Sequence, residues 1–402
     1  MTIQGTCDVR FDGVREEFER NFDERGEVGA SVCVMIEGRT VVDLWGGVSD
    51  RHTLRPWERN AIGWVWSCTK GATALCAHLL ISRGSLDLDR PVASYWPEFG
   101  QEGKDGITVR MLLNHQAGLP AIRQPLVAGG LYDWQYLTGV LAAEEPFWEP
   151  GTRQGYHATT FGHLVGELIR RVSGRPFDVF FRDEIAGPLG LDFYFGLPEE
   201  NEPRVAPTIR ADPPPPGEPR SRFIAAMSSD PNSIQALMVK NTGQRSPSGD
   251  HNSREARRAV LPSQGGITNA RGLAGMYAPL AQGGGRLVDA DTLKQMGTVS
   301  SAIGVDSTLL IGLRIALGYW KSSDNRQGPP GARDSMILSE EAFGHPGMGG
   351  SLGFADPGAK MSFGYTMNKQ GRGVGLNERG QNLVDAVYRA LGYRTNRWGW
   401  WM

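Results

Sequence analysis

Apolar runs near the start of the chain predict a pair of β-strands. Positions 30–36 and 40–44 are mostly apolar, on either side of Glu37-Gly38-Arg39, and the second run ends at Trp45-Gly46-Gly47. Two such runs around a glycine-containing turn predict a β-hairpin. Residues 1–20 mix apolar and charged positions in the manner of an amphipathic helix start and hold no apolar core of signal-peptide length.

The longest apolar stretch with helical spacing begins at Gly71. Its regularly spaced apolar residues are Ala72, Leu75, Cys76, Leu79 and Leu80, and Gly84 follows as a stop signal. This pattern predicts a helix that its neighbours bury on all sides. Ser67 and Lys70 stand at the start of that helix.

The spacing of apolar residues also predicts helices in the middle of the chain and strands near its end. Helical spacing occurs in four segments, 107–115, 131–143, 160–172 and 176–185, which Gly and Pro residues separate. The stretch 203–222, with Pro213 to Pro216, predicts a surface crossover or lid loop. Strands are expected at 309–317 and on both sides of Asp356-Pro357-Gly358, the second at 361–367, and a last helix at 382–391.

Strands at both ends with helices between them predict a two-lobed α/β protein. We expect residues 1–90 and 265–402 to form one α/β lobe with a mixed antiparallel sheet flanked by helices. Residues 91–264 should form an inserted, mainly helical lobe. No internal repeat is evident, and no oligomeric state is predicted.

Composition narrows the class of protein further. The chain has 402 residues, 40% of them hydrophobic, and a formal net charge of −2, as expected of a globular enzyme. With no basic excess and no run of about 18 apolar residues, nucleic-acid and membrane partners are not expected. The four cysteines show no C-x-x-C spacing, which favours a reducing cytoplasm.

No motif in the chain predicts a metal or a cofactor. His157 and His163 are six residues apart, which does not place them together on one helical face as a zinc pair requires. No phosphate-binding loop or dinucleotide fingerprint is present. The eleven tryptophans, among them Trp64, Trp66 and Trp320, are expected to pack in the core or to wall an acyl pocket.

Ser67-Cys68-Thr69-Lys70 carries the candidate chemistry. Residues three apart at a helix start lie one turn apart on one face, so the serine hydroxyl and the lysine amine should be neighbours. A serine hydroxyl is a weak nucleophile unless a nearby group removes its proton or stabilises the alkoxide electrostatically, and Lys70 can do either. A partly desolvated Lys70 would have a lowered pKa and could act as that group.

A second serine offers a rival motif. Gly349-Gly350-Ser351-Leu352-Gly353 matches the G-x-S-x-G elbow of α/β-hydrolases. That elbow needs a helix after the serine and a histidine later in the chain. The residues after Ser351 predict a turn into a strand, and all seven histidines precede it, so we expect Ser351 not to be the nucleophile.

The chain resembles the serine β-lactamase-like and penicillin-binding-protein-like superfamily, and within it the class C β-lactamase-type, family VIII carboxylesterases. Besides Ser67 to Lys70, the similarity includes Leu86 to Val92, Leu112 to Leu119, Pro150-Gly151-Thr152 leading to Tyr156, Leu164 to Glu167 and Pro188 to Leu191. It covers nearly the whole chain. It implies a nucleophile at Ser67, a lysine partner at Lys70, and a proton-shuttling hydroxyl at Tyr156.

The resemblance also implies an oxyanion hole made by the backbone N–H groups of Ser67 and Met348. For Tyr156, a phenol with a pKa near 10 needs a nearby cation to act as a base, and Lys70 would supply it. A tyrosinate bonded to Ser67 could then accept the serine proton. The alternative is that Tyr156 has only a structural role, in which it bonds backbone groups at the start of a helix.

Two departures from the family pattern bear on the substrate. Ala158 stands where related lactamases carry an asparagine, and His345-Pro346-Gly347 stands where they carry Lys-Thr-Gly. Alanine cannot bond a substrate amide, and a largely neutral histidine attracts a carboxylate less than lysine would. His345, Gly347 and Ala158 are therefore expected to line a site for neutral substrates. The alternative for His345 is a structural role in holding its strand.

Together these patterns predict a serine hydrolase of the carboxylesterase type that cleaves small neutral esters through an acyl-Ser67 intermediate, with weak β-lactamase side activity. An acyltransferase, or a hydrolase of amides and D-amino-acid peptides, is the alternative on the same site. A non-catalytic, filament-forming scaffold is the alternative of another class.

Overall fold

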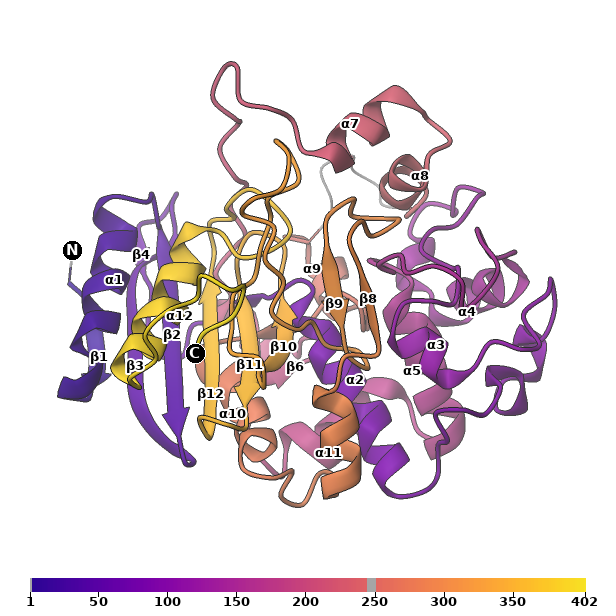
Figure 1. Ribbon diagram of the computed structural model, residues 1–402, viewed down its shortest axis with the longest axis horizontal. Helices are drawn as coiled ribbons and strands as arrows, with labels where there is room; N and C mark the ends of the chain where they lie inside the picture. Colours follow the sequence, from indigo (N-terminus) through magenta and orange to yellow (C-terminus); the bar gives the residue numbers. More distant parts are fainter. Residues whose placement is uncertain (1, 244–250) are drawn as a thin grey trace.

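The computed structural model describes residues 2–243 and 251–402. Its main sheet has seven antiparallel strands in the order β1-β3-β2-β12-β11-β10, with β4 paired to the end of β3. The strands are β1 Gln4–Cys7, β2 Gly29–Ile36, β3 Arg39–Asp50, β4 Arg55–Pro56, β10 Phe343–Pro346, β11 Leu352–Asp356 and β12 Met361–Met367. Both ends of the chain thus build one sheet, at the left of Figure 1.

The predicted hairpin is confirmed as β2 and β3. Its turn residues Glu37 and Gly38 have φ values of 49° and 77°, the left-handed conformations that match the twist of a tight hairpin. The second strand continues past Trp45-Gly46-Gly47 to Asp50, so the predicted end was wrong. The chain continues there because β1 pairs with the first part of β3 and β4 with the last.

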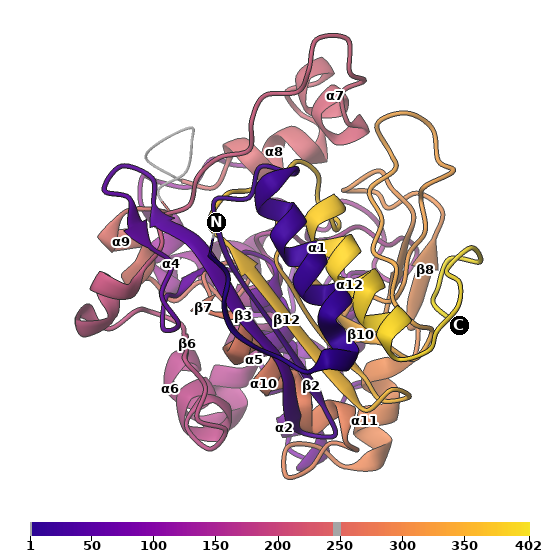
Figure 2. The same cartoon turned by 90° about the vertical axis from the view of Figure 1, so that its left-hand side faces the viewer.

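Helices cover both faces of the sheet. In β2, Val32 and Val34 face the core under α1 (Asp12–Asp23) and α12 (Glu378–Ala390), while Cys33 faces α10 (Ala270–Ala281). This alternation is the normal two-residue period of a strand. Figure 2 shows α1 and α12 side by side over the outer face of the sheet.

A glycine in β12 lets α10 lie directly against the inner face. A Cβ atom on Gly364 would lie 2.1 Å from the carbonyl oxygen of Ala270, so no larger residue fits without moving the helix. The elements from the Ser67 helix to residue 264 are mainly helices, as expected, and those between residues 109 and 173 lie on the right of Figure 1. These helices are α2 Cys68–Ser82, α3 Val109–Leu113, α4 Trp134–Ala143, α5 Phe161–Ser173, α6 Phe177–Phe181, α7 Arg222–Ser229, α8 Ile234–Lys240 and α9 Arg254–Arg258.

The remaining elements are short. The strands β5 Gly63–Trp64, β7 Ile267–Thr268 and β6 Phe193–Tyr194 form a small sheet, and β8 Ser301–Ile303 pairs with β9 Leu313–Ile315. Helix α11 spans Ala290–Gly297. Single 3₁₀ turns are η1 Val9–Phe11, η2 Val92–Ser94, η3 Pro97–Phe99, η4 Gly130–Tyr132 and η6 Glu199–Arg204, and a π-helical turn, η5 Arg182–Ala186, follows α6.

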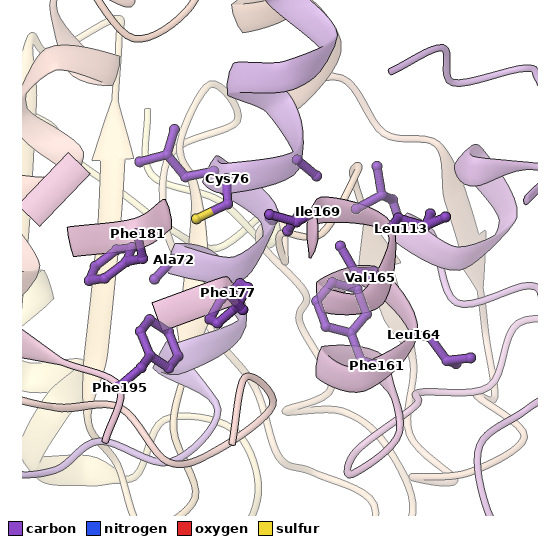
Figure 3. Close-up of a cluster of buried hydrophobic side chains, with 14 of the residues drawn as sticks. Ala72, Cys76, Leu113, Phe161, Leu164, Val165, Ile169, Phe177, Phe181 and Phe195 are labelled. Carbon is purple, nitrogen blue, oxygen red and sulfur yellow. The ribbon is translucent and has the colours of Figure 1, made fainter. Parts of the chain in front are cut away.

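Helix α2 is buried nearly all round, as its apolar pattern predicted. Figure 3 shows Ala72 and Cys76 of this helix among the rings of Phe177, Phe181 and Phe195 on one side and the α5 side chains on the other. Helix α2 is therefore a rigid support for the residues at its N-terminus. Within the described residues, every helix is too short or too polar to span a bilayer.

The expected strand at 309–317 is shorter than predicted, and the last helix is longer. Only Leu313–Ile315 pairs as a strand, whereas α12 begins at Glu378. Residues 212–220 are exposed, in agreement with the predicted surface loop, but the prediction was wrong at Val205 and Ala206, which are buried. The fold class is confirmed by the comparisons given below, and the lobe boundaries at residues 90 and 264 stay a prediction.

Candidate active site

Ser67 lies at the N-terminus of α2, at the floor of a cavity. The preceding residue, Trp66, has a φ of 50°, a left-handed conformation that is uncommon for a residue other than glycine. The flanking residues Val65 and Cys68 are buried, and Ser67 itself is partly accessible. The turn before α2 thus presents the serine hydroxyl to the cavity while its neighbours stay in the core.

Lys70 is fully buried and faces Ser67. Its Nζ lies 3.2 Å from Ser67 Oγ and donates to two backbone carbonyls, Ala158 O at 2.7 Å and Ser263 O at 2.9 Å. Burial lowers the pKa of Lys70 well below its ordinary value of 10.5. A neutral amine has two N–H groups and one lone pair, and the two carbonyls take both N–H groups. The lone pair is then left for the Ser67 hydroxyl.

The Ser263 carbonyl is itself held in place by the Ser263 side chain. Its hydroxyl donates to Thr159 O at 2.7 Å and accepts from Gly162 N at 2.6 Å. A Cβ atom on Gly162 would lie 2.1 Å from Ser263 N, so this close approach requires glycine. The sequence does not signal this role of Ser263, because no local pattern connects it to a lysine 193 residues away.

Tyr156 completes the group around Ser67. Its ring centroid lies 4.9 Å from Lys70 Nζ. Burial raises the pKa of Tyr156 above its ordinary value of 10.0, and the neighbouring Ser67 hydroxyl only partly opposes this shift. The phenol is therefore protonated near neutral pH. Burial of Tyr156 and Lys70 disfavours the expected tyrosinate, because a Lys70 amine with a lowered pKa is a weaker cation than the hypothesis required. The role of Tyr156 stays a prediction.

The backbone around Tyr156 is fixed by groups from distant segments. His115 accepts a hydrogen bond from His157 N through Nδ1, at 3.0 Å, and one from Gly155 N through its carbonyl, at 3.1 Å. His115 belongs to the Leu112 to Leu119 motif, so this contact gives that motif a structural role. His157 Nε2 accepts from Leu119 N at 3.0 Å.

Asp306 is a buried carboxylate that the sequence analysis also missed. It accepts the Tyr156 N–H at 3.0 Å, those of Thr308 and Leu309, each at 2.9 Å, and the Gln154 amide at 3.2 Å. Burial raises the pKa of its carboxyl group, and these donors oppose the shift. Asp306-Ser307-Thr308 has the composition of a turn, and nothing in it signals a contact with Tyr156.

Removing the Asp306 carboxylate should destabilise this region. We expect Asp306→Ala to lower the free energy of unfolding by about 3 kcal/mol, because several buried N–H donors lose their acceptor. Asp306→Asn keeps one acceptor oxygen and should lose less. Urea denaturation of the two variants measures the difference, and equal stability of both with the wild type would contradict this role.

His345 and Gly347 approach the site from β10 and the turn after it. His345 is buried, with Nδ1 2.7 Å from Pro346 O and Nε2 3.5 Å from the Tyr156 hydroxyl. Burial lowers its pKa to about 3, so the ring is neutral. Nδ1 carries the proton toward the carbonyl, which leaves Nε2 as an acceptor for Tyr156. His345 lies behind Tyr156 and is not part of the cavity lining.

Gly347 brings the turn against the segment before Ser67. A Cβ atom there would lie 2.1 Å from Ser351 Oγ and 2.3 Å from Val65 O. Met348, the next residue, lines the cavity beside Ser67. Among the residues that the structure describes, the backbone N–H groups of Ser67 and Met348 donate to no protein acceptor. Both groups remain available to a ligand oxygen.

Ser351 has a structural position. Its side chain is buried, and its hydroxyl donates to Val65 O at 3.1 Å. The residues after it form the strand β11. This is the arrangement expected from the sequence, in which Ser351 does not lie on a nucleophile elbow.

The cavity above Ser67 has a volume of about 300 Å³ and an apolar lining. Its walls include Trp64, Trp66, Trp320 and Ala158, three tryptophans and the alanine that the sequence singled out. Among residues 2–243 and 251–402, no Lys, Arg, Asp or Glu lines the cavity. The cavity therefore suits an uncharged ligand.

A family model described as Beta-lactamase matches residues 15–388. The chain belongs to the β-lactamase family. It is 32% identical over 383 residues to the esterase/β-lactamase LipL of Mycobacterium tuberculosis, covering 91% of this chain and 83% of that protein. The predicted family resemblance is thereby confirmed.

Solved structures agree with this assignment. A family VIII carboxylesterase superposes with a TM-score of 0.82 at 36% identity, and a penicillin-binding protein homologue from Caulobacter crescentus with 0.84 at 36%. Each comparison covers 97% of this chain and 100% of the other. The protein is a serine hydrolase with the two-lobed β-lactamase-like fold.

Proposed function

We propose that this protein hydrolyses neutral carboxylic esters through an acyl-Ser67 intermediate. The observation that carries the proposal is the position of Lys70, whose amine is desolvated, fixed by two carbonyls and 3.2 Å from Ser67 Oγ. Lys70 accepts the Ser67 proton while the hydroxyl oxygen attacks the ester carbonyl. The N–H groups of Ser67 and Met348 stabilise the oxyanion that forms.

Tyr156 acts in this proposal as a neutral proton relay. Its hydroxyl lies 3.5 Å from His345 Nε2, and the Ser67 hydroxyl is near enough to lower its pKa. It passes a proton from the lysine to the leaving alcohol as the tetrahedral intermediate collapses. Water then attacks the acyl group by the reverse path, and Ser67 is released. His345 thus acts as a hydrogen-bond acceptor for Tyr156. The expected direct contact of His345 with the substrate stays a prediction.

The cavity favours small-molecule esters over lactams. The part of the lining that the structure describes has no cation for a carboxylate, and the Ala158 carbonyl already accepts from Lys70. Weak lactam cleavage remains compatible with the same nucleophile and oxyanion donors. All four cysteines are free thiols, which is consistent with the cytoplasmic location that we expect.

Comparing two substrates tests this function. The kcat/KM for p-nitrophenyl butyrate should exceed that for a chromogenic cephalosporin by at least about 100-fold, since the lactam loses the polar partners that it needs. An equal or higher value for the cephalosporin would refute the esterase proposal. Added alcohol or amine acceptors in the same assay separate hydrolysis from the acyltransferase alternative. Absence of turnover on every ester and lactam would favour a scaffold.

The pH dependence tests which group is the base. Because burial lowers the pKa of Lys70, its ammonium should lose the proton well below pH 10.5. Hence kcat/KM should rise with pH through that lowered pKa and then level off. A pH-stat assay with methyl butyrate measures the profile. A rate that keeps rising beyond pH 10.0, the ordinary tyrosine value, would point to a tyrosinate base instead.

A further inference from the structure

Helices α7 and α8 form a separate layer at the top of Figure 1, and both contribute side chains to the lining of the cavity. Two buried amide side chains fix α8 to the rest of the molecule. At its start, Gln235 Nε2 donates to the carbonyls of Ser307 and Thr308, at 3.0 and 2.8 Å. Just after its end, Asn241 Nδ2 donates to the carbonyls of Ile122 and Arg123, at 2.8 and 2.9 Å. Helix α8 is thus a fixed wall.

Helix α7 is less firmly attached to the rest of the molecule than α8. It has no fully buried residue, and its first backbone N–H, from Arg222, donates to Gly331 O at 2.9 Å. Phe223 of this helix lines the cavity that contains Ser67, as do Met238 and Val239 of α8. The next residue along α7, Ile224, is 40% exposed and does not line it.

An aromatic wall is formed by other segments of the same cavity. The rings of Trp64 and Trp66 lie 6.1 Å apart, and the ring of His251 lies 5.0 Å from that of Trp66. The cavity that these rings share with the helical layer has room for far more than an acetyl group. Binding an apolar substrate group in a cavity with this lining is favourable, because it removes the apolar surface of that group from water.

Building on the ester hydrolysis proposed above, we infer that α7 and α8 form a substrate-binding cap that selects esters carrying a bulky, uncharged apolar group. The group, an aryl ring or a branched alkyl chain, lies between Phe223, Met238 and Val239 of the cap and the aromatic wall beside Ser67. Small esters react at the same serine without touching the cap.

Three esters and two neighbouring residues test this inference. Methyl phenylacetate and benzyl acetate are isomers that carry the same ring on opposite sides of the ester, and methyl acetate lacks the ring. In the wild type, at least one of the isomers should have a higher kcat/KM than methyl acetate. Phe223→Ala should lower that value about tenfold and change methyl acetate less than about twofold. Ile224→Ala, the matched control, should change none of the three.

Val239→Ala is a second variant with little risk to folding, because Val239 is 45% exposed at the mouth of the cavity. It should reduce turnover of the same isomer as Phe223→Ala. If methyl acetate is hydrolysed but both cap variants leave the bulky esters unchanged, or lower all three esters equally, the cap inference is wrong while ester hydrolysis stands. If the wild type hydrolyses none of the three, the proposed function itself is overturned.

Discussion

Ser67→Ala should lower kcat on neutral esters by at least ~10³-fold, because the variant has no oxygen to carry the acyl group. Residual turnover would come from the oxyanion donors and from substrate binding alone. Steady-state assays on p-nitrophenyl butyrate measure the loss, and the unfolding midpoint should stay close to that of the wild type because Ser67 is partly accessible.

Ser351→Ala is the matched control for this experiment. It also removes one serine hydroxyl near the site, but that hydroxyl donates to Val65 O in the core. We expect a loss of about 1 kcal/mol in stability and little change in kcat. If Ser351→Ala abolished activity and Ser67→Ala preserved it, the nucleophile assignment would be wrong.

Lys70 and Tyr156 should behave as one unit. Lys70→Met and Tyr156→Phe should each lower kcat by about 10²-fold or more, because each interrupts the same proton path. The double variant should lose no more kcat than the worse single variant, because either substitution alone already interrupts the proton path. Steady-state kinetics of the three variants give the coupling directly.

Two results would contradict this coupling. Fully additive losses would mean that Lys70 and Tyr156 act in separate steps. A Tyr156→Phe enzyme with a near-normal rate across pH would mean that the tyrosine only fills space beside Trp320, whose ring it meets edge to face at 5.6 Å. Retention of the wild-type far-UV circular dichroism spectrum in each variant excludes unfolding as the cause.

Local patterns in the sequence predicted the parts of the site that depend on nearest neighbours. The Ser67 to Lys70 spacing and the apolar helix behind it are set by residues within one helix, so their geometry follows from helical periodicity. The β2–β3 hairpin and β12 follow in the same way from short apolar runs around turns.

The remaining features depend on contacts between distant segments. Asp306 meets Tyr156 across 150 residues and Ser263 meets Lys70 across 193, and neither has a local signature. The protonation state of Tyr156 depends on how fully the fold buries it, which the sequence motif does not specify. The cap helices α7 and α8 follow a proline-rich loop and are too short for their periodicity to stand out.

Labelling with a fluorophosphonate, followed by intact-mass analysis and peptide mapping, tests the central claim most directly. We expect one adduct per chain, located on the peptide that contains Ser67, and none in Ser67→Ala. An adduct that persists in Ser67→Ala, or one that maps to the peptide containing Ser351, would contradict the acyl-Ser67 mechanism.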